Sequence, residues 1–459
     1  MTADLVVLGA GPAGLGAAYR AARGDHRVVV LERAAGPGGA AASLEVGGIR
    51  VDLGSHRLHP STDPAILADL RALLGDDLQR RPRRGRIRLA GRWIAFPLRP
   101  GDLARQLPPS LALAAAWDAA TAWARRPGAD TFAEVLRAGL GPTLCERFYF
   151  PYARKLWGLA PDELSGQQAR RRVSADSPAK LLRRVLSGAA GGGFFYYPRG
   201  GFGQISERLA QAAAAAGAQL RFGAAAERVA LRPDGVVVTV AGGGSVAGRR
   251  LWSTIPLAAL ARMSEPAAPP DVLEAAGRLE TRSLVLVYLV LPVGRYSPYD
   301  AHYLPAASTP VTRISEPTNY RDGDDPPGRT VLCAELPCRR DDDLWTADDP
   351  TLAAIVRATL RGHELPDVAP VEVAVRRLAQ AYPVYRAGFE PAFATLDAWA
   401  HAQPALLTFG RQGLFVHDNS HHALAMAWAA AAALRPGGGF DDAAWAAARA
   451  RFAAHVVED

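Results

Sequence analysis

The chain has 459 residues, of which 49% are hydrophobic, and it carries a formal net charge of +8 at pH 7. A chain of this length can bury substantial cores, so we expect two or three interleaved lobes. Nearly all of its basic residues are arginines, and lysine occurs only at Lys155 and Lys180. A biased genomic composition explains this preference for arginine better than nucleic-acid binding does. We therefore expect no nucleic-acid partner.

The cysteines and the N-terminus indicate the compartment. Cys145, Cys333 and Cys338 have no C-x-x-C spacing, which predicts neither a disulfide framework nor a zinc knuckle. The chain enters an apolar strand within its first residues and shows no signal-peptide pattern. The alanine-rich run from Leu111 to Ala124 contains Asp118 and is shorter than the roughly twenty apolar residues of a membrane span. We expect a soluble, cytoplasmic protein without a transmembrane segment, and peripheral membrane contact stays open.

The run from Val6 to Gly16 (VVLGAGPAGLG) is typical of a dinucleotide-binding turn between a strand and a helix. Its three glycines permit a tight turn, close approach of a pyrophosphate, and close packing of the helix on the strand. The helix N-terminus offers free N–H groups to the anion, and Glu32, which ends a second strand, can accept from ribose hydroxyls. The candidate cofactor contacts of this unit are Gly9, Gly11, Pro12, Ala13, Gly14, Glu32 and Arg33.

The rest of the chain predicts further strands and helices that return to this nucleotide lobe. In chain order we expect a strand near 48–59, a hairpin at 86–96, helical periods from 103 to 186, a helix at 205–216, strands at 219–222, 226–231, 235–241 and 250–254, a long strand at 283–291, strands at 302–305, 311–315 and 330–336, and a helix at 352–360. The nucleotide-binding element is therefore split, which argues against a simple two-lobe dehydrogenase.

Three later blocks extend the pattern of cofactor contacts. They are ERAAGPGGAAAS at 32–43, DLGSHRLH at 52–59 and TFGRQGLFVHDNSHH at 408–422. With the first turn they resemble the flavoprotein superfamily of amine oxidases, protoporphyrinogen oxidases, carotenoid desaturases and UDP-galactopyranose mutases, over almost the whole chain. The resemblance implies bound FAD, with contacts at Gly38, Gly39, Ala40, Gly54, Ser55, His56, Val229, Gly410, Arg411, Asp418, Asn419 and Ser420. Ala40 stands where the family often has an arginine.

The resemblance implies an α/β fold: a Rossmann-like FAD-binding domain of the GR2 type, an interleaved substrate-binding sheet and a mostly helical insertion. The expected segments are the first part of the FAD-binding domain (1–100), the helical insertion (101–190), the return of the FAD-binding domain with a linker (191–260), the substrate-binding sheet (261–400) and the closing FAD-binding segment (401–459).

The histidines of the closing block also allow a metal interpretation. His417 and His421 are four residues apart, a spacing that can bind zinc from one helix face. However, Asp418, Asn419 and Ser420 are helix-capping residue types, which would place His417 before the helix. We therefore favour a helix that begins at the flavin edge, where its N-terminus would stabilise negative charge on the flavin, and expect no metal.

Three other segments narrow the resemblance. Phe195 to Phe202 (FYYPRGGF), Thr312 to Tyr320 (TRISEPTNY) and Ala381 to Tyr385 (AYPVY) resemble the branch that contains UDP-galactopyranose mutases. In the mutases the second segment supplies an arginine toward the substrate diphosphate, and Arg313 stands at that position. The other diphosphate arginine has no clear counterpart among residues 170–172.

Two hypotheses follow for the reaction. The first is a redox enzyme in which FAD takes a hydride from a small organic molecule and passes electrons to oxygen or another acceptor. The second is a mutase-like, non-redox isomerase that acts on a sugar nucleotide through reduced flavin. His56 is the first candidate for the base, with Tyr382 and Tyr385 behind it, and Arg313 is a catalytic candidate in both hypotheses. Candidate substrate contacts are Tyr197, Phe202, Arg313 and Glu316, unless Arg313 and Glu316 form a structural ion pair with each other. A catalytically silent partner protein is a third class, and homo-oligomerisation stays open.

Overall fold

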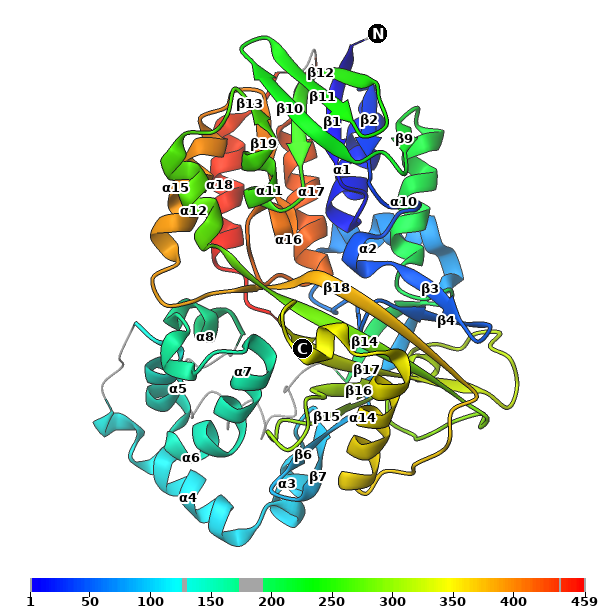
Figure 1. Cartoon of the computed structure of the whole chain (residues 1–459), viewed down its shortest axis with the longest axis vertical. Helices are drawn as coiled ribbons and strands as arrows, with labels where there is room; N and C mark the ends of the chain where they lie inside the picture. The colour runs from blue at the N-terminus through cyan, green and yellow to red at the C-terminus, as the bar shows by residue number, and fades with distance from the viewer. Residues whose placement is uncertain (1, 126–129, 173–192, 437–438, 458–459) are drawn as a thin grey trace.

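The chain folds into two lobes that share one interface (Figure 1). The computed structural model describes residues 2–125, 130–172, 193–436 and 439–457. The upper lobe in Figure 1 holds the N-terminal strand and the last long helices, and the lower lobe holds a second sheet with a group of helices beside it. The chain passes repeatedly between the lobes, so each lobe is built from segments far apart in the sequence.

The upper lobe is built on an eight-stranded sheet. Its strands in spatial order are β13 (Ser264–Glu265), β10 (Ala226–Arg232), β11 (Gly235–Val240), β12 (Ser245–Ser253), β1 (Ala3–Leu8), β2 (Val28–Leu31) and β9 (Gln219–Arg221), with β19 (Leu406–Thr408) beside β12. β1 pairs in parallel with both β12 and β2. Both faces of β1 and β2 are buried, which explains why these strands read as continuous apolar runs rather than as alternating patterns.

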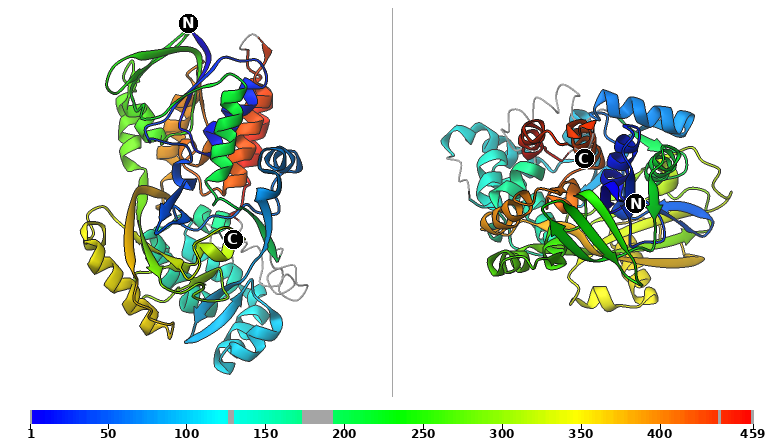
Figure 2. Two further views of the ribbon diagram at one scale, coloured as in Figure 1. Left: turned by 90° about the vertical axis from the view of Figure 1, so that its right-hand side faces the viewer. Right: turned by 90° about the horizontal axis from the view of Figure 1, so that it is seen from above.

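Small residues let three helices pack closely on one face of this sheet. Helix α1 (Pro12–Ala22) lies against α10 (Gln204–Ala215) and α17 (Ser420–Ala433), as both views of Figure 2 show. A Cβ on Gly16 of α1 would lie 2.7 Å from the Trp428 ring of α17, so a side chain there would push the helices apart. The other helices of this lobe are α2 (Pro64–Leu74), α11 (Leu257–Arg262), α12 (Pro270–Arg278), α15 (Glu390–His401), α16 (Gly410–Gly413) and α18 (Asp442–Ala453).

The lower lobe is built on a seven-stranded sheet. Its strands in spatial order are β18 (Glu372–Val384), β14 (Glu280–Leu291), β17 (Thr330–Cys338), β16 (Arg313–Ser315), β15 (Ala301–Tyr303), β6 (Gly85–Leu89) and β7 (Arg92–Phe96). The hairpin β6–β7 falls in the range expected for the first FAD-binding segment, yet it pairs with β15 in this second sheet. A hairpin pattern gives the local fold of a segment but not the sheet that it joins.

The side chains of β14 alternate between two cores. Val285, Val287 and Leu289 pack with helix α14 (Asp349–Gly362), whereas Leu284 and Leu286 pack with the hairpin of β3 (Ser43–Val46) and β4 (Ile49–Asp52). Since both faces are covered, every position of this strand from 284 to 291 is apolar. The β3–β4 hairpin thereby carries the segment 52–59 onto the second sheet.

A mostly helical region packs beside this sheet. It contains α3 (Pro100–Gln106), α4 (Pro109–Ala120), α5 (Phe132–Leu140), α6 (Pro142–Leu144), α7 (Phe150–Trp157) and α8 (Gly166–Arg172). Its core includes Phe132, Phe150 and Trp157 and reaches Val384 at the end of β18. Residues 173–190 of the expected helical insertion lie outside the described residues. Among the described residues, no helix combines the length and the apolar character that a membrane crossing requires.

A buried carboxylate fixes the start of the 52–59 segment. Asp52 accepts hydrogen bonds from the hydroxyl groups of Ser43 and Tyr197 and from the backbone N–H of Phe202 at 2.9 Å. Tyr197 belongs to β8 (Phe194–Pro198), which pairs with β5 (Leu78–Pro82). One side chain therefore joins the hairpin to β8 and to the turn that follows it.

We expect the substitution Asp52→Ala to lower the free energy of unfolding by about 3 kcal/mol, because three donors lose a charged and buried partner. Denaturant unfolding followed by circular dichroism measures this loss. The matched control is Glu45→Ala on the exposed face of the same hairpin, which should change stability by less than about 0.5 kcal/mol. Equal stabilities of the two variants would contradict this role of Asp52.

Candidate active site

Three loops from distant parts of the chain meet at the N-terminus of α1. Gly14 packs on the preceding strand so closely that a Cβ there would lie 1.9 Å from the carbonyl oxygen of Gly9. A Cβ on Gly39 would lie 3.3 Å from the Cα atom of Gly11, and one on Gly410 would lie 3.0 Å from the Cβ atom of Ala13. The glycine turn, the 38–39 loop and the closing segment therefore form one cradle of backbone.

The cradle presents unpaired donors and an acidic group. Helix α1 begins at Pro12, and its N-cap, Gly11, makes no side-chain capping bond, so the first N–H groups face the loop. The Glu32 carboxylate accepts from the backbone N–H groups of Ala10 and Ala34, each at 2.8 Å. Each of its oxygens keeps a further lone pair for a ribose hydroxyl. Arg33 and Ala40, in contrast, are exposed.

Val229, one of the cofactor contacts that the resemblance implies, lies within the nucleotide-lobe sheet. It lies in β10, a strand paired on both edges, and its N–H donates to the carbonyl oxygen of Met263 at 2.8 Å. Its side chain is fully buried in the core of the upper lobe. Its backbone N–H is therefore already used within the sheet.

The Gly54–His56 turn is fixed on the second sheet by Glu335 of β17. One oxygen of the Glu335 carboxylate accepts from the backbone N–H of Ser55 at 3.0 Å. Nε and Nη2 of Arg313 donate to the same carboxylate at 2.7 to 3.0 Å, in a bidentate ion pair. Glu335 thus holds His56 and Arg313 in one region, where the two lobes meet.

The His56 ring is held in one orientation and in one protonation state. Nε2 lies 3.0 Å from the carbonyl oxygen of Leu53, which can only accept, so Nε2 carries the proton and donates. The ring stacks on Phe202 at 5.4 Å between centroids. Burial lowers the pKa of His56 below the usual 6.5, against the opposing influence of Asp52. At neutral pH the ring is uncharged, and Nδ1 has a free lone pair.

A second group of side chains surrounds Tyr382, at the end of β18. The guanidinium of Arg411 lies 5.1 Å from the centre of the Tyr382 ring. Burial lowers the pKa of Arg411, and no ion pair to this arginine occurs among the described residues. Burial and three arginines lower the pKa of the adjacent His417, which is therefore neutral. A buried cation without a carboxylate partner fits an anionic or electron-rich ligand.

The closing helix begins as its capping residues predict. Asn419 is the N-cap of α17, so His417 lies before the helix and does not share a face with His421. The structure instead brings His455 next to Asp418 at 3.0 Å, and ligand atoms of Asp418, His422 and His455 lie within 4.8 Å of one another. Sequence reasoning missed this group because His455 follows the motif by more than thirty residues.

Three of the aromatic candidates are buried in the framework around the site. Tyr197 is fully buried and donates to Asp52, and Phe202 packs under the ring of His56. Tyr385 is also buried, and its hydroxyl donates to the carbonyl oxygen of Phe415 at 2.8 Å. Tyr197 and Tyr385 therefore hold the backbone around the site and are not positioned as a substrate contact or a base.

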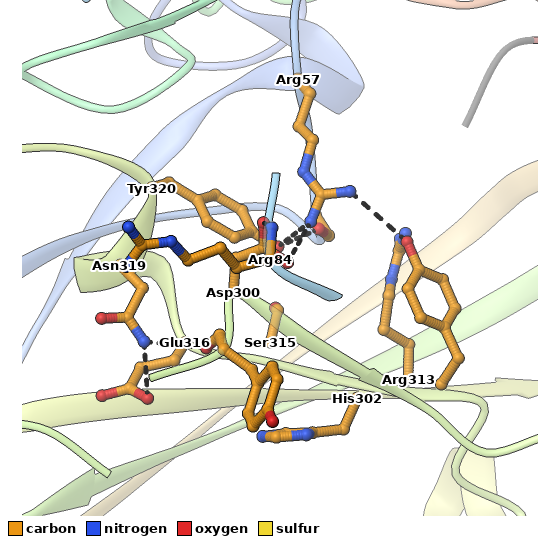
Figure 3. Close-up of polar contacts among 12 residues, drawn as sticks. Arg57, Arg84, Asp300, His302, Arg313, Ser315, Glu316, Asn319 and Tyr320 are labelled. Carbon is orange, nitrogen blue, oxygen red and sulfur yellow. Dashed lines mark hydrogen bonds and ion pairs between the residues drawn. The ribbon is translucent and has the colours of Figure 1, made fainter. Parts of the chain in front are cut away.

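Glu316 does not pair with Arg313. Its fully buried carboxylate accepts from the backbone N–H groups of Tyr296 and Ser297 and from the side chains of Asn319 and Thr330. Figure 3 shows Glu316 and Asn319 turned away from Arg313. Glu316 thus organises a loop of the second sheet instead of facing a substrate.

A second buried ion pair adjoins the first, and sequence reasoning missed it. Arg57 donates to Asp300 at 3.0 Å, and its guanidinium lies 5.0 Å from the ring centre of Tyr320 (Figure 3). Tyr320 shares a hydrogen bond with the hydroxyl of Ser55, which connects this pair to the His56 turn. The only signal in the sequence was the position of Arg57 directly after His56.

The comparisons with known proteins agree with this geometry. The family model described as flavin containing amine oxidoreductase matches residues 12–435. The chain belongs to the flavin-containing amine oxidoreductase family. It is 30% identical over 341 residues to the putative flavin-containing monoamine oxidase AofH of Mycobacterium tuberculosis, across 70% of this chain and 72% of that protein. It is also 44% identical over 72 residues to phytoene dehydrogenase of Streptomyces griseus, across 16% and 14% of the two chains.

Solved structures share the fold of this family member at low sequence identity. A reduced UDP-galactopyranose mutase has a TM-score of 0.78 at 20% identity and covers 94% of this chain and 93% of its own. A putative protoporphyrinogen oxidase from Exiguobacterium sp. 255-15 has a TM-score of 0.71 at 19% identity, with coverage of 98% and 99%. Putrescine oxidase bound to putrescine has a TM-score of 0.64 at 17% identity, with coverage of 94% and 98%.

This family member is an FAD-dependent oxidoreductase, and the described residues fit its cofactor. The cradle around Gly11 has the bare backbone and free N–H groups that a diphosphate needs, and Glu32 has spare acceptors for a ribose. Arg411 supplies a buried positive charge where the closing segment meets the second sheet. These groups would hold the two ends of the dinucleotide.

We expect Gly11→Ala to produce a folded protein that binds FAD more weakly. Gly11 has a negative φ, and an added Cβ would meet the protein only at 3.8 Å, so the fold accepts it, whereas the methyl group would occupy the place of the diphosphate. The affinity for FAD should fall at least tenfold, or about 1.4 kcal/mol, in a titration followed by flavin absorbance. Gly36→Ala, where a Cβ meets nothing within 4 Å, is the matched control. A Gly11→Ala protein that binds FAD like the control would rule out this cradle.

Proposed function

We propose that the enzyme oxidises a small organic metabolite in the cytoplasm by removing a hydride and a proton from it. An amine is the first substrate class to test, since the family and the relative AofH carry names of amine-oxidising enzymes. The observation that carries the proposal is the state of His56: a neutral ring, with its proton fixed on Nε2, directly after Ser55, whose backbone N–H donates to Glu335 of the Glu335–Arg313 pair. Such a ring is a base that is ready at neutral pH.

FAD, when bound, supplies the hydride acceptor at flavin N5 and passes the electrons to oxygen or another acceptor. The protein's part is to hold the donor and to take the proton. As the hydride leaves carbon, Nδ1 of His56 accepts a proton from the substrate nitrogen or oxygen, and a C=N or C=O bond forms; a C=C bond would need the proton from a neighbouring carbon. The contact with Phe202 and the bond to Leu53 keep the ring from turning away.

Arg313 and Tyr382 are the groups that we assign to orienting the substrate. Glu335 uses Nε and Nη2 of Arg313, which leaves Nη1 outside the ion pair for a polar group of the substrate. Burial raises the pKa of Tyr382, so its phenol keeps its proton and can donate. Both residues are partly exposed, as is His56.

Anaerobic mixing with candidate substrates tests the reaction class. We expect an amine or related donor to bleach the oxidised flavin in a single turnover without any other reductant. A mutase-like isomerase, which the likeness to the mutase fold and Arg313 would favour, predicts the reverse. In that case a sugar nucleotide turns over only after chemical reduction of the flavin, and no donor bleaches it.

We expect His56→Ala to retain FAD and to lose about 10²- to 10⁴-fold in the rate of flavin reduction, the usual contribution of a general base. Because the neutral ring is the active form and its pKa lies below 6.5, the wild-type rate should be level at neutral pH and fall only in more acidic solution. This acidic decline should vanish in the variant. His401→Ala, at the exposed end of α15, is the control. A wild-type rate in His56→Ala would remove His56 from the mechanism.

A further inference from the structure

Helix α4 presents an apolar face to solvent. Leu113 and Trp117 are 72% and 71% exposed, and Trp123, in the turn that follows the helix, is 87% exposed. All exposed positions from 112 to 124 are apolar, namely Ala112, Leu113, Ala116, Trp117, Ala119, Ala120, Trp123 and Ala124. Large exposed side chains that gather on one element mark an interaction surface more often than scattered ones do.

The acidic residue of this helix points inward. Asp118 is 6% exposed, and its carboxylate accepts from the backbone N–H of Thr143 at 2.7 Å, at the start of α6. A Cβ on Gly141 would clash with the same side chain, so the two helices meet closely there. The outer face of α4 therefore carries no negative charge, although the sequence of the helix contains one.

Exposed arginines surround the N-terminal half of α4. Arg105 lies at the end of α3, directly before it, and Arg147 lines a hollow together with Ser110 and Ala114 of α4. Glu146 also lines this hollow, but its carboxylate is paired with Arg137 at 3.0 Å. Ala90, in the turn between β6 and β7, lines the same hollow, which brings the exposed Arg92 to this side of the molecule. Figure 1 shows α3, α4 and the β6–β7 hairpin together at the lower rim, far from the nucleotide lobe.

We propose that this surface, formed by Leu113, Trp117 and Trp123 with the arginines at 92, 105 and 147, docks on an anionic phospholipid bilayer. Tryptophans favour the boundary between headgroups and acyl chains, and arginines beside them attract acidic headgroups. With 12 residues, α4 is too short to cross a bilayer, which takes about 20, so it would lie in the plane of the interface.

A second copy of the chain fits this surface less well. In a symmetric dimer the same patch faces itself, which would bring the arginines of both copies together without an exposed acidic residue on α4 to pair with them. An acidic lipid surface offers both an apolar layer for the tryptophan rings and negative headgroups for the arginines. The site of oxidation does not include these residues, so the docking is independent of the proposed reaction.

Co-sedimentation of the FAD-loaded protein with vesicles tests this surface. We expect binding to vesicles of equal parts phosphatidylcholine and phosphatidylglycerol, weaker binding to phosphatidylcholine alone, and a decline with salt. The double variant Trp117→Ser, Trp123→Ser should bind at least tenfold more weakly, and Arg105→Glu with Arg147→Glu should lose the preference for acidic vesicles.

The control is Val371→Ser. Val371 is an apolar residue directly before β18 that is 58% exposed, and its replacement should leave vesicle binding unchanged. FAD content and melting temperature of each variant verify that it is folded. The proposal fails if the wild-type protein sediments with neither vesicle, or if the tryptophan variant binds as the control does. It also fails if the wild-type protein is a dimer without lipid that the tryptophan variant turns into a monomer.

Discussion

The carboxylate of Glu335 holds the active region together. Through one oxygen it fixes the backbone of Ser55, on a segment that comes from the β3–β4 hairpin, and through both it holds the guanidinium of Arg313. Its side chain is 4% exposed. A buried ion pair of this kind contributes little to stability by itself, but removal of one partner leaves an uncompensated charge, so the arrangement is enforced. The position of the proposed base thus depends on a residue about 280 positions later in the chain.

Two such pairs keep the interior of the site electrically balanced. Arg57 with Asp300 and Arg313 with Glu335 lie side by side, and all four side chains are mostly buried. These two ion pairs therefore add no net charge beside the proposed base, although the whole chain carries a net charge of +8. Arg411, on the side where the closing FAD segment arrives, has no ion pair among the described residues, which agrees with a cofactor that becomes more negative during the reaction.

The parts of the site that the sequence could predict are those defined by local chemistry. The glycine turn, the doublet at 38–39 and the cap of α17 each need particular residue types within a few positions, and the structure has all three where they were expected. Contacts between residues on different strands could not be predicted from the sequence. Arg313 and Glu316 are close in the sequence, but β16 ends at Ser315, and Glu316 lies at the start of the 3₁₀ turn 317–320 that follows it, so each has a different partner. The hairpin at 86–96 was recognised, yet its sheet was not, because strand pairing between distant segments leaves no local pattern.

A double-mutant cycle between Arg313→Ala and Glu335→Gln tests the central role of this carboxylate most directly. The quantity to measure is the rate of substrate-driven flavin reduction at saturating FAD for the wild-type enzyme, both single variants and the double variant. If Glu335 acts by holding Arg313 beside His56, the double variant should be hardly slower than the slower single variant, with a coupling energy of at least about 1 kcal/mol. Losses that simply add would show that the two residues act independently and would contradict the account.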